Sequence, residues 1–221
     1  MRRVPRWTLL PSGTAPVVLV VGWTAAAALE GPSYDAVRQT ISVLAAYGAA
    51  GFWVMTGALL AVGLCHLGTA WGLRAAATPG RVALAAGGMA ALAVAFVPTP
   101  SSGGSLRHGS VAATGFALLA LWPVLASVRG GTTAPWALRP WPAALATASM
   151  GAGALWYLVE TDRDGAAGVA ERLVTCMQSL WPLVVVLSCL WHQRGTAPRT
   201  GPVRADAGRG RGAAGADPGR D

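Results

Sequence analysis

The chain contains no lysine, and it has only nine acidic residues among 221. Charged residues make up 12% of the sequence, whereas apolar residues make up 53%. That is about half the charged share of a typical soluble domain, too little to cover a water-soluble globule of this length. The composition therefore predicts a membrane protein. Because lysine codons are A-rich, the missing lysine also indicates a GC-rich bacterial genome.

Cysteine and histidine are scarce too, with three of each. The cysteines lack metal-ligand spacing, so we expect them to be free packing residues. The histidines fall at different predicted depths, which excludes paired haem ligands, and only a weak zinc set can be assembled from His108, Asp35 and Glu171. No glycine loop for phosphate is present, and Gly68-x-x-x-Gly72 favours close helix packing. The sequence predicts neither a metal nor a cofactor.

Six apolar stretches are long enough to cross a bilayer, whose core of about 30 Å needs about 20 apolar residues in a helix. They cover residues 15–29, 49–73, 82–97, 110–128, 141–159 and 173–191. The first is short unless residues 7–10 add a turn. The predicted fold is an all-α polytopic membrane protein with six transmembrane helices, preceded by residues 1–14 and followed by a disordered, arginine-rich tail at 192–221.

Arginine is distributed unevenly over the two sides that these spans define. Thirteen of the 17 arginines lie in the N-terminal segment, between spans two and three, between spans four and five, or in the tail. Six of the nine acidic residues lie on the other side. Because positive residues are retained in the cytoplasm, both termini are predicted to be cytoplasmic, in the plasma membrane of a bacterium. The formal charge of +8 therefore marks membrane flanks and the tail, and no nucleic-acid partner is expected.

An alternative remains open for the first span. Residues 1–6 are basic, an apolar core follows, and residues 26–28 are small, as in a cleaved secretory signal. Cleavage would leave five spans with the same orientation.

A polar segment follows the first span. Residues 33–46 are predicted to form a short amphipathic helix at the outer interface, capped by Ser33 and carrying Asp35 in its first turn. Asp35, Arg38 and Ser42 recur at helical spacing and would share one face. The segment is either an anchor helix with a local Asp35–Arg38 pair or one wall of a ligand site.

The entry to the sixth span carries a second polar group. Glu171, Thr175 and Gln178 recur at i, i+4 and i+7, and Arg172 flanks them. Polar groups inside a membrane are costly and normally face the bundle interior or a wet cavity. They indicate either interhelical hydrogen bonds, worth about 0.6–2 kcal/mol each, or a functional site, which we favour. A nearby proline, Pro182, offers a kink.

A third group is the loop at 98–109, which ends at the head of the fourth span. His108 stands there and would be able to shuttle a proton or bind a ligand. A structural or solvated histidine is the simpler interpretation. His66 and His192 are weaker candidates.

These residues carry a family resemblance. The motifs are Asp35-x-x-Arg38-Gln39-x-Ile41-Ser42, His108 with Leu121-Trp122-Pro123, and Ala170-Glu171-Arg172 with Gln178-x-Leu180-Trp181-Pro182. In order and spacing the chain resembles the domain of unknown function 998 family of bacterial membrane proteins over residues 17–191. Many relatives have an acid after the proline that matches Pro98, where this chain has Thr99.

The family offers no activity to transfer. The resemblance implies a single outer site, made of Asp35, Arg38, Ser42, His108, Glu171, Arg172 and Gln178. We expect Arg38 or Asp35 to approach the Glu171–Arg172 pair, with His108 on the rim.

Three functions are compatible with these observations. The favoured one is a binding protein or small transporter whose outward pocket takes a polar or amphiphilic ligand. The second is an intramembrane enzyme acting on lipid headgroups, with Glu171 or Asp35 as general base. The third is a structural scaffold. Membrane lipids are expected partners in each case, and the sequence does not set the oligomeric state.

The predicted topology can be checked with single cysteines in a cysteine-free background. Cysteines at Gly103 and Asp164 should react with an impermeant thiol reagent in intact cells, because both positions lie outside. Cysteines at Ala77, Thr132 and Ala205 should stay unlabelled until the cells are opened. External labelling at Thr132 would disprove the six-span arrangement.

Overall fold

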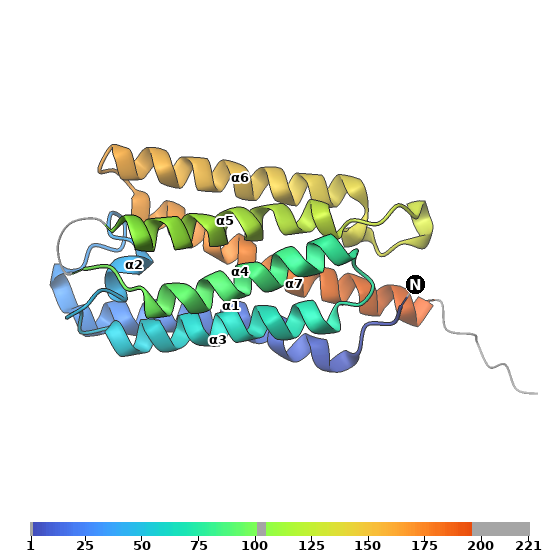
Figure 1. Ribbon diagram of the computed structural model, residues 1–221, viewed down its shortest axis with the longest axis horizontal. Coiled ribbons are helices and arrows are strands. Elements are labelled where there is room, and N and C mark those ends of the chain that lie inside the picture. Colours follow the sequence, from blue (N-terminus) through green and yellow to red (C-terminus); the bar gives the residue numbers. More distant parts are fainter. Residues whose placement is uncertain (1, 101–104, 196–221) are drawn as a thin grey trace, which may run out of the picture.

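The computed structural model describes residues 2–100 and 105–195, and all regular structure in them is helical (Figure 1). The long helices are α1 (Leu9–Glu30), α3 (Phe52–Gly72), α4 (Thr78–Phe96), α5 (Leu106–Ala126), α6 (Pro140–Asp162) and α7 (Ala167–Gly195). The short elements are α2 (Ile41–Leu44) and the 3-10 turns η1 (Arg6–Thr8), η2 (Gly31–Ser33), η3 (Gly131–Thr133) and η4 (Trp136–Leu138).

Each long helix runs antiparallel to the one before it and packs against it (Figure 1). The last helix, α7, also packs along α1, so the six helices close into a ring. The six crossings return the chain to its starting end, where the N-terminal arm lies beside the end of α7. Since α1 forms two of these contacts, a chain cleaved after residue 28 would lose one wall of the bundle.

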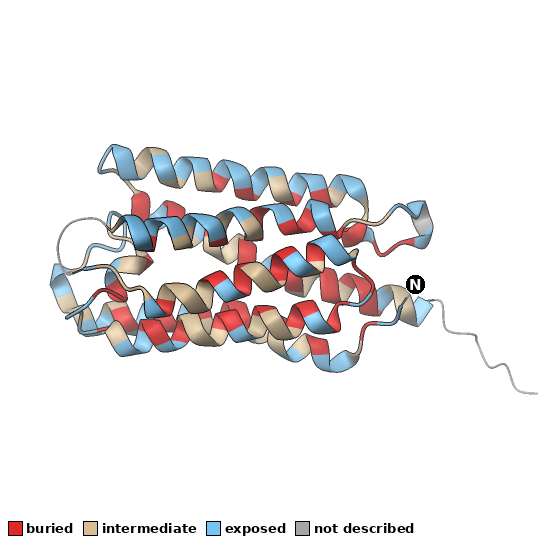
Figure 2. Cartoon of the chain, viewed as in Figure 1, coloured by how far each residue is buried: buried red, intermediate tan, exposed pale blue. Residues whose placement is uncertain are grey.

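Each of the six long helices is long and apolar enough to cross a membrane, which confirms the predicted spans. Their outer faces carry large apolar side chains, such as Leu10, Trp53 and Phe96, each more than 70% exposed. Buried positions lie on the faces turned toward other helices (Figure 2). This distribution suits a bilayer, because lipid covers the apolar outer surface that water would not tolerate.

The ends of the helices differ from the predicted boundaries. Residues 9–14 extend α1 beyond the predicted start at 15, and α7 begins at Ala167 instead of 173. Helix α7 continues through Pro182 and includes residues 192–195, which were assigned to the tail. The rest of the predicted disordered tail, 196–221, lies outside the described residues, as do positions 101–104 of the loop before α5.

The amphipathic helix predicted over residues 33–46 is wrong. The chain makes the turn η2, then an irregular segment, and becomes helical only in the four residues of α2. The carbonyls of Ala36 and Gln39, which would accept bonds within a helix, accept hydrogen bonds from Arg172 of α7 instead. Tertiary hydrogen bonds therefore outweigh the local periodicity.

Small residues bring the helix backbones close together. A Cβ added to Gly72 would overlap the side chain of Thr8, and one added to Gly68 would come 3.4 Å from Pro11. This confirms that Gly68-x-x-x-Gly72 is a packing motif. Apolar clusters fill both ends of the bundle, one around Leu73 and Trp122 and the other around Leu44 and Met55.

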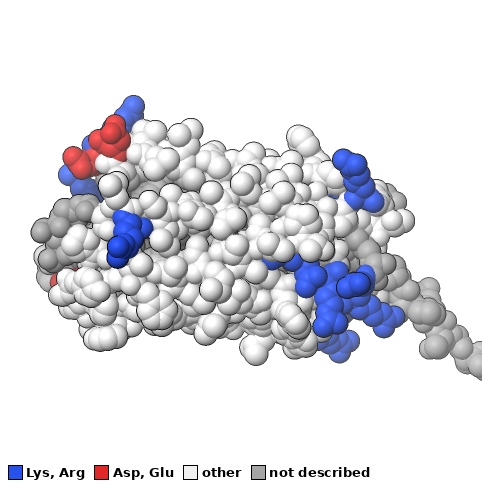
Figure 3. All heavy atoms as spheres, in the orientation of Figure 1, with Lys and Arg blue, Asp and Glu red and all other residues white. Residues whose placement is uncertain are grey.

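The two ends also differ in charge. We call the end that carries the N-terminal arm, the α3–α4 turn and the α5–α6 loop the arginine-rich end. We call the opposite end, where α6 meets α7, the acidic end. Figure 3 shows arginine without acidic side chains at the first, and both signs at the second.

The closest crossing of α3 and α4 predicts one stability effect. A Cβ on Gly63 would lie 2.7 Å from the carbonyl oxygen of Gly88 and from Leu92. Gly63→Ala should therefore destabilise the bundle by about 1–3 kcal/mol, measured as a lower midpoint for loss of monodisperse protein on heating in detergent. Gly57→Ala on the same helix is the control, because its Cβ meets nothing within 4 Å. Equal melting of both variants would contradict the close crossing.

Candidate functional site

The candidate site begins where the irregular segment before α2 meets the first two turns of α7. The guanidinium of Arg172 donates through Nη1 to the carbonyls of Ala36 (2.9 Å), Gln39 (3.1 Å) and Gly168 (2.8 Å). The Val169 amide donates to Val37, 3.2 Å away. Arg172 therefore fastens the segment to α7.

Tyr34 and Trp23 complete the environment of this arginine. Nη2 of Arg172 donates to the Tyr34 hydroxyl, and the guanidinium carbon lies 5.8–5.9 Å from the centres of both rings. Burial raises the pKa of the Tyr34 hydroxyl, although the neighbouring Arg172 opposes this shift. The phenol therefore stays neutral and can donate to the Gln39 carbonyl, 3.1 Å away.

Glu171 points the opposite way, into the bundle. It is 4% exposed, and its Oε2 accepts a hydrogen bond from the backbone amide of Ile41. Its Oε1 lies 3.5 Å from Oγ of Ser42. A carboxylate can accept about four hydrogen bonds, so this buried group keeps acceptor capacity for a further donor.

Ser42 connects this carboxyl group to His108. Nδ1 of His108 lies 2.7 Å from the Val97 carbonyl, and Nε2 lies 3.2 Å from the Ser42 hydroxyl. A carbonyl can only accept, so Nδ1 carries a hydrogen. Nε2 is then an acceptor, so the Ser42 hydroxyl has two acceptors within reach: Nε2 of His108 and Oε1 of Glu171.

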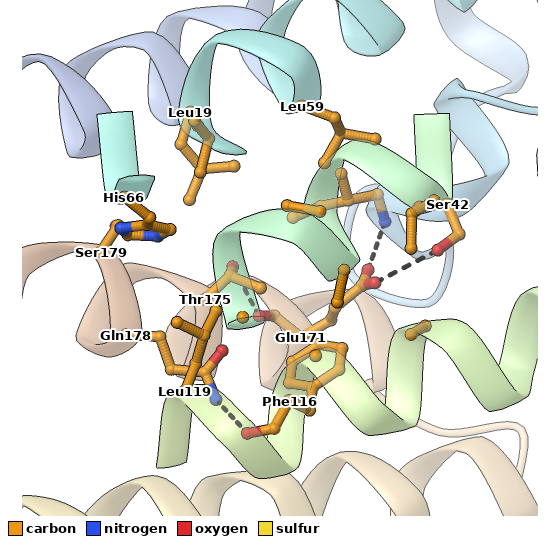
Figure 4. A pocket seen from close by; sticks show the side chains of 18 residues that line it. Leu19, Ser42, Leu59, His66, Phe116, Leu119, Glu171, Thr175, Gln178 and Ser179 are labelled. Carbon is orange, nitrogen blue, oxygen red and sulfur yellow. Dashed lines mark hydrogen bonds between the residues drawn. The ribbon is translucent and has the colours of Figure 1, made fainter. Parts of the chain in front are cut away.

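Below Ser42 lies a partly open cavity of about 100 Å³. Figure 4 shows Glu171 beside Ser42 at one side of it, with Leu19 and Leu59 across the space. Most of its 18 lining residues are apolar and come from α1, α3, α4 and α5. Among the residues that the structure describes, Glu171 is the only Asp, Glu, Lys or Arg that lines it.

A second set of polar groups lines the deeper part of the cavity. The amide nitrogen of Gln178 donates to the Phe116 carbonyl at 3.0 Å. His66 of α3 and Ser179 of α7 also line the cavity (Figure 4), and His66 is 1% exposed. No described residue offers a hydrogen-bond partner to the Nδ1 of His66. A buried imidazole nitrogen is costly unless it is paired.

The structure separates the predicted site residues into three groups. Ser42, Glu171 and Gln178 line the cavity, and His108 lies behind Ser42. Arg172 fastens the segment before α2. The segment that carries Asp35 and Arg38 does lie against Arg172, as expected. Their side chains, however, are exposed and pair with each other, with Nε 3.9 Å from Oδ2.

Two residues that contact this site, Thr99 and Tyr34, were not predicted as site residues from the sequence. Thr99 donates to the Ser42 carbonyl at 3.2 Å, so the residue after Pro98 also contacts this site. Tyr34 gave no periodic signal, because its segment is not helical. Within residues 2–100 and 105–195 no three His, Cys, Asp or Glu side chains gather as metal ligands, and the set of Asp35, His108 and Glu171 is not brought together.

The chain belongs to the DUF998 family, described as a protein of unknown function, whose profile matches residues 14–188. The resemblance seen in the sequence motifs is confirmed. Neither a curated protein nor a solved structure matches the chain. Together with the six apolar helices, the match identifies a multi-pass membrane protein of unknown function.

The role of Arg172 predicts a local effect. Arg172→Ala should remove the side-chain bonds from α7 to the Ala36 and Gln39 carbonyls and to Tyr34, at a cost of about 2 kcal/mol. Amide exchange at Ala36–Leu44 should accelerate in detergent-solubilised protein, while α3 and α4 stay protected. Arg163→Ala is the charge-matched control, since Arg163 is exposed in the α6–α7 turn. Unchanged exchange in Arg172→Ala would show that other contacts hold the segment.

Proposed function

We propose that this protein binds an amphiphilic ligand in the cavity beneath Ser42, with the ligand's polar group against Glu171 and its apolar part among the helices. We further propose that the acidic end faces the outside of a bacterial plasma membrane and both termini face the cytoplasm. The arginine distribution supports this orientation.

The observation that carries the proposal is a buried carboxyl group at the head of a mostly apolar cavity inside the span. Glu171 is 4% exposed, and beyond its bond to the Ile41 amide it keeps acceptor capacity at the cavity that a purely structural role would not use. The Nδ1 of His66, for which no described residue offers a partner, adds a second polar group at the other end of the cavity. A guest with a polar group at each place would pair with both.

The lining also narrows the chemistry of the ligand. Arg38 and Arg172, which the sequence analysis assigned to the ligand, do not line the cavity. The charged side chain that does line the cavity is the carboxyl group of Glu171. The cavity therefore favours a ligand with a cationic or hydrogen-bond-donating head over an anionic one. The same cavity would serve a small transporter if it opened alternately toward the two sides of the membrane. Measuring ligand flux into sealed vesicles distinguishes transport from binding alone.

A second candidate is an enzyme acting on lipid headgroups. The specific observation in its favour is the 3.2 Å contact between Ser42 Oγ and His108 Nε2, with Nδ1 held by the Val97 carbonyl. This is the distance at which a histidine activates a serine nucleophile. Turnover of an added phospholipid that Ser42→Ala abolishes would favour the enzyme, whereas release of an unchanged ligand favours binding.

Cavity filling tests the proposal. Native mass spectrometry of protein purified in mild detergent should detect a retained amphiphile. Ala112→Leu should reduce that retention at least about tenfold, a loss of roughly 1.4 kcal/mol of binding free energy, because Ala112 lines the cavity. Glu171→Gln should weaken retention of a cationic head.

Ala113→Leu is the matched control. Ala113 is the next residue on α5 and is exposed on the outer face, so the added volume enters lipid. Retention should be unchanged in it. Wild-type protein that carries no amphiphile, or equal retention by both alanine variants, would reject the cavity as a binding site and favour a scaffold.

A further inference from the structure

A second feature, at the arginine-rich end, is separate from the cavity. Four arginines from three segments line one open groove of about 510 Å³ together with Trp71. Arg2 and Arg3 come from the N-terminal arm, Arg74 from the α3–α4 turn, and Arg81 from the first turn of α4.

The groove is built from anchored parts. Val4, the residue after Arg3, is 3% exposed and packs in the apolar cluster that contains Leu73. This insertion fixes where the arm leaves the bundle and holds its arginines over the groove. The arm is therefore more than a loose basic extension.

The side chain of Arg81 is held in place by hydrogen bonds to backbone carbonyls of α3. Its Nε donates to the Ala70 carbonyl at 2.9 Å and its Nη2 to the Trp71 carbonyl at 3.3 Å. The remaining amino group, Nη1, is left for another acceptor. The Trp71 indole beside it is 68% exposed, at the level where indoles meet lipid headgroups.

No described residue supplies a counter-charge here. The ion pair seen between described residues, Asp35 with Arg38, lies at the acidic end of the bundle and not at this groove. The rule that places arginine in the cytoplasm explains which side these residues occupy, but it does not require four of them to share one groove. Guanidinium groups brought together repel one another unless an anion lies between them.

We propose that this groove binds a phosphate group, offered either by an anionic phospholipid headgroup or by a soluble phosphate compound. Guanidinium groups match phosphate oxygens in pairs, and several of them can share one phosphodiester. A second basic hollow next to it, lined by Arg2, Arg3 and Arg129, gives room for a second phosphate. This inference does not depend on the proposed function of the cavity.

The test uses the full chain in nanodiscs of phosphatidylcholine, with or without added phosphatidylglycerol. Native mass spectrometry should show phosphatidylglycerol retained on the wild-type protein after the bulk lipid is removed. Arg3→Gln combined with Arg74→Gln should weaken this retention by roughly tenfold or more. Arg107→Gln combined with Arg163→Gln is the control, since it removes the same charge from exposed positions at the acidic end.

Inorganic phosphate and pyrophosphate, added to protein in phosphatidylcholine alone, distinguish the two sources. Phosphatidylglycerol retained from the mixed nanodiscs, with neither anion bound in phosphatidylcholine alone, identifies the lipid. Binding of either anion, lost in the groove variant and kept in the control, identifies a soluble compound. The proposal is overturned if wild-type protein prefers neither probe over phosphatidylcholine, or if both double variants lose retention equally. Size-exclusion profiles confirm that the variants remain folded.

Discussion

The acidic end depends on one constraint: backbone groups next to the membrane interior must find hydrogen-bond partners within the protein. The chain leaves helical geometry after η2, so Ala36, Val37 and Gln39 expose carbonyls and Ile41 exposes an amide. Helix α7 satisfies all four, through Arg172, the Val169 amide and Glu171. Glu171 thus accepts from an amide of this segment, while its neighbour Arg172 donates to carbonyls of the same segment. Gly168 makes this possible, because a Cβ there would overlap the Ala36 and Gln39 carbonyls.

Fastening this segment to α7 also positions the polar side chains of Ser42, Glu171 and His108 beside it. Once Ile41 is bound to Glu171, Ser42 is placed between that carboxyl group and His108, and Thr99 holds its carbonyl. Ser42 is therefore the point at which α2, α5, α7 and the start of the α4–α5 connection meet. A change at any of these elements would alter the hydrogen bonding of Glu171, and through it the head of the cavity. The two neighbouring residues differ in what they contact. Arg172 bonds backbone carbonyls and Tyr34, whereas Glu171 bonds the Ile41 amide and also lines the cavity.

The ring of helices explains why a cavity exists at all. Helix α4 packs extensively on α3 and on α5 through glycine and alanine, while α7 packs mainly on α1 and α6 and only lightly on α3 and α5. Close packing at the arginine-rich end and around α2 leaves the space between unfilled. The polar side chains of α7 face that space. The unlike charges of the two ends then give one molecule a carboxyl-headed cavity at one end and an arginine groove at the other.

The sequence by itself determined the six helices, because an apolar run of about 20 residues has a single low-energy conformation in a bilayer. It also pointed to Ser42, His108, Glu171 and Gln178, since polar residues in such runs must face inward. Only the tertiary structure decided that residues 33–46 are mostly not helical, that Arg38 turns outward and that Arg172 binds backbone. The deciding bonds join residues about 130 positions apart, such as Ile41 with Glu171. Local periodicity contains no information about partners at that separation, so it favoured a helix that the long-range hydrogen bonds replace.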